Sequence, residues 1–367
     1  MSDNEFVNEA IERLEWSDAK VEATPQSKAR AVTRRVALGG GAGAVAAFML
    51  APAAQALAAS SSSVFGTGKK YHFVFVNHVT TNPFFTPTIS GIQDACNLLG
   101  CSYQWTGSET SNVAQMVTAF NTAIAGNADG IAIPLIDPKA FNAPTAKALA
   151  KGIPVLSYNA DEPTNGRLAY IGQDLFVSGQ DMGQRIKSLV PSGNVALFIA
   201  TPGSANIQPR INGAESVLKG SATKYTVTAT GAALPQELST IESFWQGHTS
   251  YKGLFAVDGG STQAVFQTIQ KYNLRGKGVK GGGYDLTPIT QQLLAAGEGD
   301  FTIDQQPYLQ GFLPTLELFL YHASDRLSGI ADVDTGLKFL DKTTVKPYNS
   351  TKSRYEGTSS KVGVTNS

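Results

Sequence analysis

The sequence is poor in the residues from which metal sites and nucleophilic active sites are built. Its 367 residues include two cysteines and four histidines. It contains neither a Gly-x-Ser-x-Gly elbow nor a phosphate-binding P-loop, and the spacing of its histidines fits no metal site. The histidines are His72, His78, His248 and His322. We therefore predict no catalytic residue, no metal site and no cofactor. His78 lies in a loop, where it is either a ligand contact or an ordinary loop residue.

Net charge is also lacking. Lysine and arginine number 29, as do aspartate and glutamate, so the formal net charge is zero. This balance gives no indication of a nucleic-acid or acidic-membrane partner. Charged residues make up 16% of the chain, whereas glycine occurs 37 times. Such a composition is typical of α/β proteins with many tight loops between strands and helices.

The two cysteines, Cys96 and Cys101, stand close together in the sequence. We expect the first at the end of a helix and the second just before a strand. In an exported protein they could form a local disulfide, and the alternative is that both are small buried apolar residues. The Cα separation that a bridge requires does not follow from the sequence.

Residues 1–58 have the three parts of an export signal. A basic segment containing Arg34 and Arg35 precedes a short apolar run, which ends in an alanine-rich stretch suited to cleavage after Ala56 or Ala58. The paired arginines resemble a twin-arginine signal, although Ala37 departs from the usual pattern. An uncleaved membrane anchor is the alternative, but the run is short and rich in glycine. We expect an exported protein in the periplasm or at the cell surface, with a flexible leader at 59–69 and a disordered tail at 351–367.

Strand-like and helix-like segments alternate through the rest of the chain, in two successive series. This alternation predicts an α/β fold of two doubly wound parallel-sheet domains with helices on both faces. We expect three crossing hinge segments, near residues 173, 305 and 332, with a ligand cleft between the domains. The predicted N-terminal lobe comprises 70–172 and 306–331, and the C-terminal lobe comprises 173–305 and 332–350.

The loop after the first strand carries Asn82, Pro83, Phe84 and Phe85. It follows the apolar run Phe73-Val74-Phe75-Val76, which predicts a strand buried on both faces. Ligands bind beyond the carboxyl ends of parallel strands, which is where this loop lies. Two aromatic rings beside an amide suit a sugar, whose apolar face packs on rings while its hydroxyls form hydrogen bonds. The alternative is a turn whose phenylalanines fill the core.

Polar side chains follow five other predicted strands. Each of them alone has an ordinary explanation as a helix cap, an Asx-turn or a solvated loop residue. Together they predict a cleft whose carboxylates and amides bind the hydroxyls of a sugar or polyol. The residues are Asn159, Gln208 and Arg210 in the segment 201–210, Asp258, Asp285 and Gln305.

From about residue 71 to about 347 the chain resembles periplasmic sugar-binding proteins of the ribose/galactose type, which are the solute receptors of ABC importers. Six motifs support the resemblance: Asn82-Pro83-Phe84-Phe85, Gly130-Ile131-Ala132-Ile133-Pro134, Gly152-Ile153-Pro154-Val155, Ile171-Gly172-Gln173-Asp174, Gly282-Gly283-Tyr284-Asp285 and Phe301-Thr302-Ile303-Asp304-Gln305. The resemblance implies a monomeric receptor that captures a monosaccharide or polyol by hinge closure and delivers it to a membrane permease.

The resemblance also implies roles for individual residues. Phe84 and Phe85 would sandwich a sugar ring beside Asn82, and Asp285 would accept hydrogen bonds from hydroxyls. Asp258 stands where the family often has asparagine, and Gln305 lies on the hinge side of the cleft. Asn159-Ala160 replaces an acidic residue followed by arginine, and Gln208 occupies the position of a loop arginine that Arg210 could replace. These differences argue against ribose and leave another aldose, a cyclitol or a deoxy sugar open.

Three alternative functions are considered. A receptor for a membrane sensor kinase would share the same cleft and cannot be told from a transport receptor by sequence. A glycoside-acting enzyme would need paired carboxylates, and Asp258 with Asp285 is the candidate pair. We expect neither carboxylate to lie where its pKa would be raised enough for a general acid. A sugar-responsive repressor is disfavoured because no DNA-binding helices precede the first domain.

Overall fold

The computed structural model describes residues 69–351, which belong to one unit that begins at Ser61. The predicted export signal, the predicted leader apart from residue 69 and the predicted tail apart from residue 351 lie outside the described residues. Within 69–351, no helix combines the length and apolar character needed to cross a bilayer.

One six-stranded sheet is parallel throughout, with the strand order β11-β5-β4-β3-β1-β2. The predicted apolar strand lies inside it, where Phe73 pairs with Tyr103 on one side and with Gly130 on the other. Its side chains alternate between the two faces of the sheet, and both faces are buried. The strands are β1 (His72–Asn77), β2 (Ser102–Gly107), β3 (Gly130–Ile133), β4 (Val155–Tyr158), β5 (Ala169–Gly172) and β11 (Val333–Asp334).

The second six-stranded sheet has the order β12-β10-β9-β8-β6-β7. Its strands are parallel except for β12, which runs antiparallel to β10. The two sheets therefore have equivalent orders, as the restart of the strand series predicts. The strands are β6 (Gly193–Ile199), β7 (Thr223–Ala229), β8 (Gly253–Ala256), β9 (Lys280–Tyr284), β10 (Phe301–Asp304) and β12 (Lys338–Leu340).

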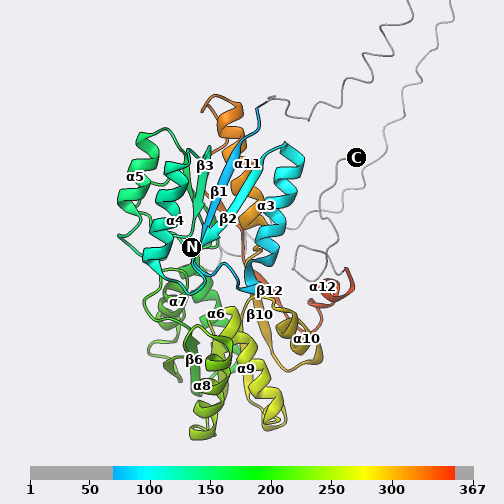
Figure 1. The fold of residues 1–367 in the computed structure, drawn as a ribbon. Coiled ribbons are helices and arrows are strands. Elements are labelled where there is room, and N and C mark those ends of the chain that lie inside the picture. The colour runs from blue at the N-terminus through cyan, green and yellow to red at the C-terminus, as the bar shows by residue number, and fades with distance from the viewer. Residues whose placement is uncertain (1–68, 352–367) are drawn as a thin grey trace, which may run out of the picture. The chain divides into compact units, whose positions relative to one another are not determined.

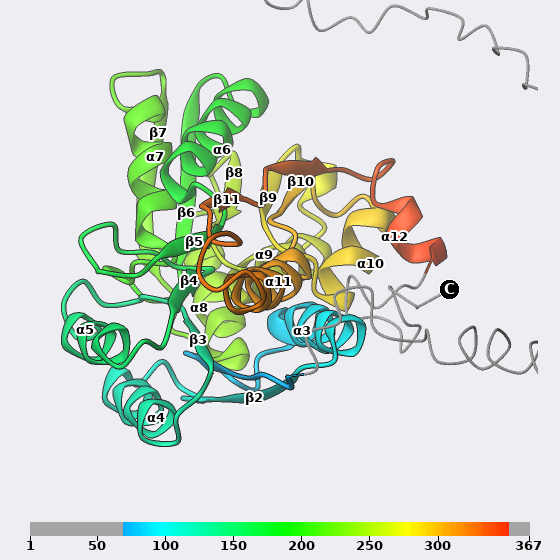
Figure 2. The ribbon, with the colours of Figure 1, turned by 90° about the horizontal axis from the view of Figure 1, so that it is seen from above.

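Helices cover both faces of each sheet, which confirms the predicted doubly wound class. In the first, α3 and α11 pack on one face and α4 and α5 on the other (Figures 1 and 2). In the second, α6 and α7 pack on one face, and α8, α9 and α10 on the other. The helices are η1 (Pro83–Phe85), α3 (Thr86–Leu99), α4 (Val113–Ala125), α5 (Asn142–Ala150), α6 (Leu175–Leu189), α7 (Gln208–Leu218), α8 (Leu234–Gly247), α9 (Gly259–Lys271), η2 (Arg275–Lys277), α10 (Pro288–Ala296), α11 (Leu309–Ala323) and α12 (Lys346–Thr351).

The chain crosses from one sheet to the other after β5, after β10 and after β11. The first two crossings lie at Gln173 and Gln305–Gln306, where we expect them. The third lies later than expected. The predicted boundary assigned 332 onward to the C-terminal lobe, but Val333 pairs with Ile171 of the first sheet. The crossing therefore falls between β11 and β12, because the short strand β11 extends the first sheet before the chain leaves it.

Helices α3 and α11 approach each other closely at two glycines. A Cβ at Gly311 would overlap the backbone oxygen of Thr88, and one at Gly91 would overlap that of Tyr308. This close contact fixes α3, which begins directly after the loop containing Phe84 and Phe85.

Replacing Gly311 with alanine tests how closely the helices pack. Alanine normally favours a helix over glycine, but here the added methyl group meets backbone. We expect Gly311→Ala to lower the free energy of unfolding by roughly 1–3 kcal/mol in a urea titration. Gly247→Ala, at the end of α8 with nothing near the added methyl, is the matched control and should be neutral. Equal stabilities of the two variants would contradict the close packing.

Candidate functional site

A cavity of about 390 Å³ lies where the carboxyl ends of strands from both sheets meet. It is lined by the loops that follow β1, β4, β6, β7, β8, β9 and β10, which is the position that parallel α/β sheets offer to ligands. Eight of the predicted site residues line it: Asn82, Phe84, Phe85, Asn159, Arg210, Asp258, Asp285 and Gln305.

Gln305 joins the two sheets at the base of this cavity. Its Nε2 donates to Asp285 Oδ1 over 2.7 Å, and its Oε1 accepts from Asn159 Nδ2 over 3.4 Å. Asn159 Nδ2 also donates to Gln310 Oε1 over 3.2 Å. All four side chains are buried. The amide and carboxylate groups therefore bind one another, and their remaining lone pairs and protons can face a ligand.

Asp285 and Arg210 place opposite charges beside the cavity. Burial raises the pKa of Asp285 to about 6, while the charge of Arg210 and the hydrogen bond from Gln305 act in the opposite direction. The prediction that neither candidate carboxylate has a raised pKa is therefore wrong for Asp285. Near neutral pH this side chain remains mostly ionised, so it serves as a hydrogen-bond acceptor.

The Arg210 guanidinium is held from several sides. It lies 4.1 Å from the centre of the Tyr284 ring, and its Nη1 donates to the Val257 carbonyl over 2.9 Å. Its Nη2 donates to Gln173 Oε1, at the first crossing, over 3.4 Å. Its Nε is buried and has no hydrogen-bond partner among the described residues. A ligand oxygen bound near Arg210 Nε would accept the hydrogen bond that this buried N–H group can donate.

Asp258 is chiefly a helix cap. Its Oδ1 accepts from Ser261 N and its Oδ2 accepts from Ala200 N, each over 2.9 Å. Both oxygens are therefore occupied by backbone donors, which fits the alternative explanation given for this residue. It holds the end of β6 against the start of α9 at the wall of the cavity.

Glu237, which sequence reasoning missed, lies against Asp258. It enters from the first turn of α8, is 2% exposed, and accepts a hydrogen bond from Ser261 Oγ over 3.1 Å. Burial and the charge of Asp258 raise the pKa of Glu237 to about 8. Glu237 therefore keeps its proton near neutral pH, because ionising this buried carboxyl would place its charge beside Asp258. The signal available in the sequence was the position of Glu237 in the first turn of the helix after β7, a strand whose end is not in the predicted set.

The phenylalanine pair has a different geometry from the predicted sandwich. The two rings meet edge to face with centres 4.7 Å apart, so no sugar ring fits between them. Phe85 is 1% exposed and contacts Trp105 and Tyr158, so it mainly fills the core. Phe84 is partly exposed and offers the apolar surface. Asn82 caps the short helix η1, since its Oδ1 accepts from Phe84 N over 2.9 Å.

His78 and Asn206 connect the loops of the two sheets across the cavity. Their Nε2 and Nδ2 atoms lie 3.4 Å apart, and Ala205 N donates to the Ile136 carbonyl, also over 3.4 Å. Burial lowers the pKa of His78 to about 4, so the ring is neutral near pH 7. These contacts join the two sets of loops at a point other than the crossings.

Gln208 does not line the cavity. Its Oε1 accepts from Gly203 N over 2.8 Å and its Nε2 donates to Asn212 Oδ1 over 2.9 Å, so both ends of the amide bind within their own loop and helix. Arg210 lines the cavity instead. This agrees with the possibility that Arg210 replaces the loop arginine expected at position 208. Asn206 and Gln263 also line the cavity and were not predicted.

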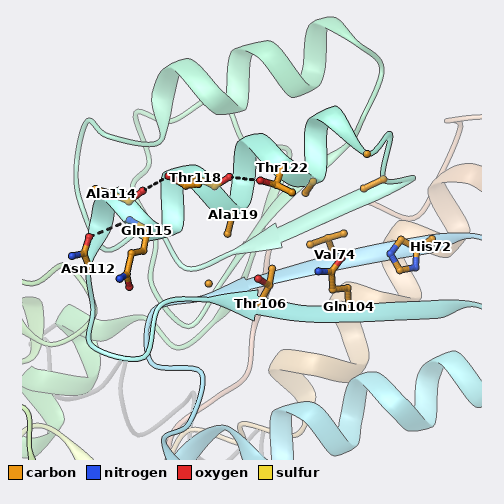
Figure 3. Close-up of a pocket in the computed structure, with 14 residues that line it drawn as sticks. His72, Val74, Gln104, Thr106, Asn112, Ala114, Gln115, Thr118, Ala119 and Thr122 are labelled. Carbon is orange, nitrogen blue, oxygen red and sulfur yellow. Dashed lines mark hydrogen bonds between the residues drawn. The ribbon is translucent and has the colours of Figure 1, made fainter.

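A second hollow, of about 600 Å³, lies between α4 and the strands β1 and β2 (Figure 3). Its lining contains no lysine, arginine, aspartate or glutamate. Two of its threonines bond to the helix itself, since Thr118 Oγ1 donates to the Ala114 carbonyl and Thr122 Oγ1 to the Thr118 carbonyl, each over 2.9 Å. This hollow lacks the charged side chains that the first cavity contains. Within 69–351, no cluster of three or more metal-ligating side chains occurs.

Comparison with known proteins identifies the class. Residues 73–318, well over half of the chain, match the family described as the periplasmic binding protein domain. The chain belongs to this family, which confirms the resemblance found in the sequence. Members of the family bind solutes without catalysis, in agreement with the prediction that the chain is not an enzyme.

Particular relatives are sugar-binding proteins. The chain is 53% identical over 304 residues to the xylose/arabinose-binding protein XylF of Sulfolobus acidocaldarius, over 79% of this chain and 75% of that relative. An ABC transporter solute-binding protein from Burkholderia graminis, solved in complex with D-arabinose, has a TM-score of 0.72 at 25% identity, over 76% of this chain and 98% of that one. A carbohydrate transporter from Acidothermus cellulolyticus, solved in complex with myo-inositol, has a TM-score of 0.70 at 24% identity, over 78% and 100%.

Replacing Glu237 with glutamine tests whether Glu237 keeps a proton near neutral pH. Because the folded-state pKa of Glu237 is raised from 4.5 to about 8, its ionisation lowers the free energy of unfolding as the pH rises between these values. Glu237→Gln has no proton to lose. We therefore expect its melting temperature to fall less than that of the wild type between pH 5 and pH 9.

Glu242→Gln is the control, because Glu242 lies on the same helix but pairs with Lys271. It should retain the wild-type difference between the two pH values. A Glu237→Gln protein with the full wild-type pH dependence would show that Glu237 ionises normally.

Proposed function

We propose that the protein is an exported receptor that captures an aldopentose, xylose or arabinose, in the cavity between its two sheets. The observation that supports this most directly is the hydrogen-bonded set of Asn159, Gln305 and Asp285 at the base of the cavity, with the charge of Arg210 acting on Asp285. Its acceptors and donors match a ring of neighbouring hydroxyl groups. The 53% identity to a xylose/arabinose-binding protein supports the pentose class.

The size and the walls of the cavity favour a small sugar. A volume of about 390 Å³ is at the lower end of ligand-site volumes, about 300–1,000 Å³. Phe84, Leu234 and Ile289 give one side apolar surface, suited to the apolar face of a sugar ring. Asn82, Phe84, Phe85, Asn159, Arg210, Asp258, Asp285 and Gln305 form the proposed site, together with Glu237. In this proposal Phe85 supports the site by filling the core next to it, and Asp258 supports it by capping α9.

Binding closes the two domains around the sugar. A ligand shifts a conformational equilibrium only by the amount that it prefers one state, and a sugar touching both domains at once prefers the closed state. Asn82, Phe84 and Asn159 contact it from the first sheet, and Arg210 and Asp285 from the second. No bond is made or broken, so the receptor releases the sugar unchanged.

The export signal and the downstream partner complete the proposal. The twin-arginine type signal at 1–58 would deliver the receptor to the periplasm or cell surface, where it acts as a monomer and passes its sugar to an ABC permease. The alternative partner is a membrane sensor kinase that recognises the closed form. A stable complex with the permease in sugar-containing detergent solution would favour transport.

A ligand screen with the full-length chain tests the proposed class. A bound ligand raises the melting temperature in proportion to ln(1 + [L]/Kd). We expect D-xylose or an arabinose to raise it, with ribose, myo-inositol and amino acids giving smaller shifts. If only an amino acid raises it, the sugar assignment is wrong although the receptor class stands.

Changing Asp285 to asparagine tests the site. The substitution preserves shape but removes a charged acceptor and places a donor opposite Gln305 Nε2. We expect pentose affinity, measured by isothermal titration calorimetry, to fall about 10–100-fold, in line with the loss of a hydrogen bond to a charged group. Asp285→Ala should show the same direction and remain folded by circular dichroism.

The matched control is Gln208→Ala, which alters a residue predicted for the site that binds only its own neighbours. Its affinity should equal that of the wild type. Loss of affinity in Gln208→Ala with retention in Asp285→Asn would reverse the assignment of the two residues.

A further inference from the structure

The only two cysteines of the sequence lie in contact at the end of α3 that is remote from the cavity. Their Sγ atoms are 3.0 Å apart. This is closer than roughly 3.5–4.0 Å, the separation at which even unbonded carbon atoms pack best. Both are thiols in the structure, with Cys96 buried and Cys101 partly exposed.

The backbone holds the two residues in this contact. Gly100 has a φ of 72° and ends α3 in the left-handed conformation. The N–H groups of Gly100 and Cys101 both donate to the Cys96 carbonyl, over 2.9 Å and 3.1 Å. The bond from Cys101 is that of a Schellman cap, in which the residue after the glycine meets the side chain one turn back in the helix, and the bond from Gly100 is that of the αL cap. The cap therefore brings the cysteines together by backbone geometry and not by chance side-chain rotation.

We propose that Cys96 and Cys101 form a disulfide once the protein is in an oxidising environment. A disulfide sulfur–sulfur bond is about 2.05 Å long, so the two sulfurs need to approach by only about 1 Å. The proposal depends on export and is independent of which ligand the cavity takes. Exported proteins are the ones in which structural disulfides persist.

The chemistry requires an oxidant, which we take to be a low-molecular-weight disulfide. The hydrogen bond with Cys101 and burial raise the pKa of the Cys96 thiol, so the partly exposed Cys101 is the first to react. Its thiolate attacks one sulfur of the oxidant and releases one thiol. The Cys96 thiolate then attacks the Cys101 sulfur of this mixed disulfide and releases the second thiol. The protein loses two electrons and two protons, which the oxidant gains.

The bond would join the last turn of α3 to the chain that enters β2. It closes a short loop, so its stabilising effect on the folded state is smaller than that of a bridge over a long loop. The cavity lies at the opposite end of α3, on the order of 20 Å away by the rise of a helix of this length. We therefore expect an effect on stability and none on ligand affinity.

The decisive experiment is a thiol count on the full-length chain. The protein is incubated with oxidised glutathione, denatured, alkylated with iodoacetamide and weighed by mass spectrometry. We expect a monomer two hydrogen atoms lighter than the reduced chain that takes up no alkyl group. Two alkylated cysteines, a glutathione adduct that persists, or a disulfide-linked dimer would each overturn the proposal.

Thermal unfolding separates the disulfide from other effects of a reductant. Dithiothreitol should lower the melting temperature of the oxidised wild type by a few degrees, because the bridge restricts the unfolded chain. It should leave a Cys96→Ala/Cys101→Ala variant unchanged, and an equal shift in that variant would contradict the bridge. Pentose affinity should be the same with and without dithiothreitol. If no pentose binds either form, the proposed function fails while the thiol count still decides the disulfide.

Discussion

Two hydrogen bonds by which the Gln305 side chain joins the two sheets are the interaction on which the arrangement of the cavity depends. It donates to Asp285 from the second sheet and accepts from Asn159 of the first. Both partners are buried and have positive φ angles, 64° for Asn159 and 72° for Asp285, which non-glycine residues seldom adopt. Strain of this kind persists only where the surroundings enforce it. The buried Gln305 amide bonds to both residues and so holds the two strand ends in this conformation.

The same glutamine connects the cavity to the crossings between the domains. The Gln305 carbonyl accepts from Thr335 Oγ1 over 2.8 Å, so the second crossing is bonded to the third. Gln173 Nε2, at the first crossing, donates to the Gly336 carbonyl over 3.1 Å. Arg210 then contacts Gln173 from the cavity side. The three crossings therefore form one hydrogen-bonded hinge, and a ligand that engages Arg210 and Asp285 acts on side chains bonded directly to it.

The sequence predicted the fold class because buried parallel strands are recognised as short apolar runs between helical patterns. It placed Asn159, Arg210, Asp285 and Gln305 at the cavity because strand ends meet at one edge of a sheet. It did not predict β11, whose pairing of Val333 with Ile171 depends on a partner far away in the chain. It missed Glu237 and misassigned Gln208 for the same reason, since the direction of a side chain depends on tertiary partners such as Asp258 and Asn212.

Charge balance explains why this cavity suits a neutral polyhydroxylated ligand. Asp285 is mostly ionised near neutral pH, Glu237 keeps its proton, and Arg210 supplies one positive charge. An anion would add negative charge beside the buried Asp285 carboxylate, and a cation would lie close to the guanidinium, so each loses hydration without gaining a free counter-charge. Hydroxyl groups donate to this carboxylate and accept from Arg210 Nε, which has no other partner among the described residues. A sugar therefore satisfies the buried groups of both signs without introducing a charge of its own.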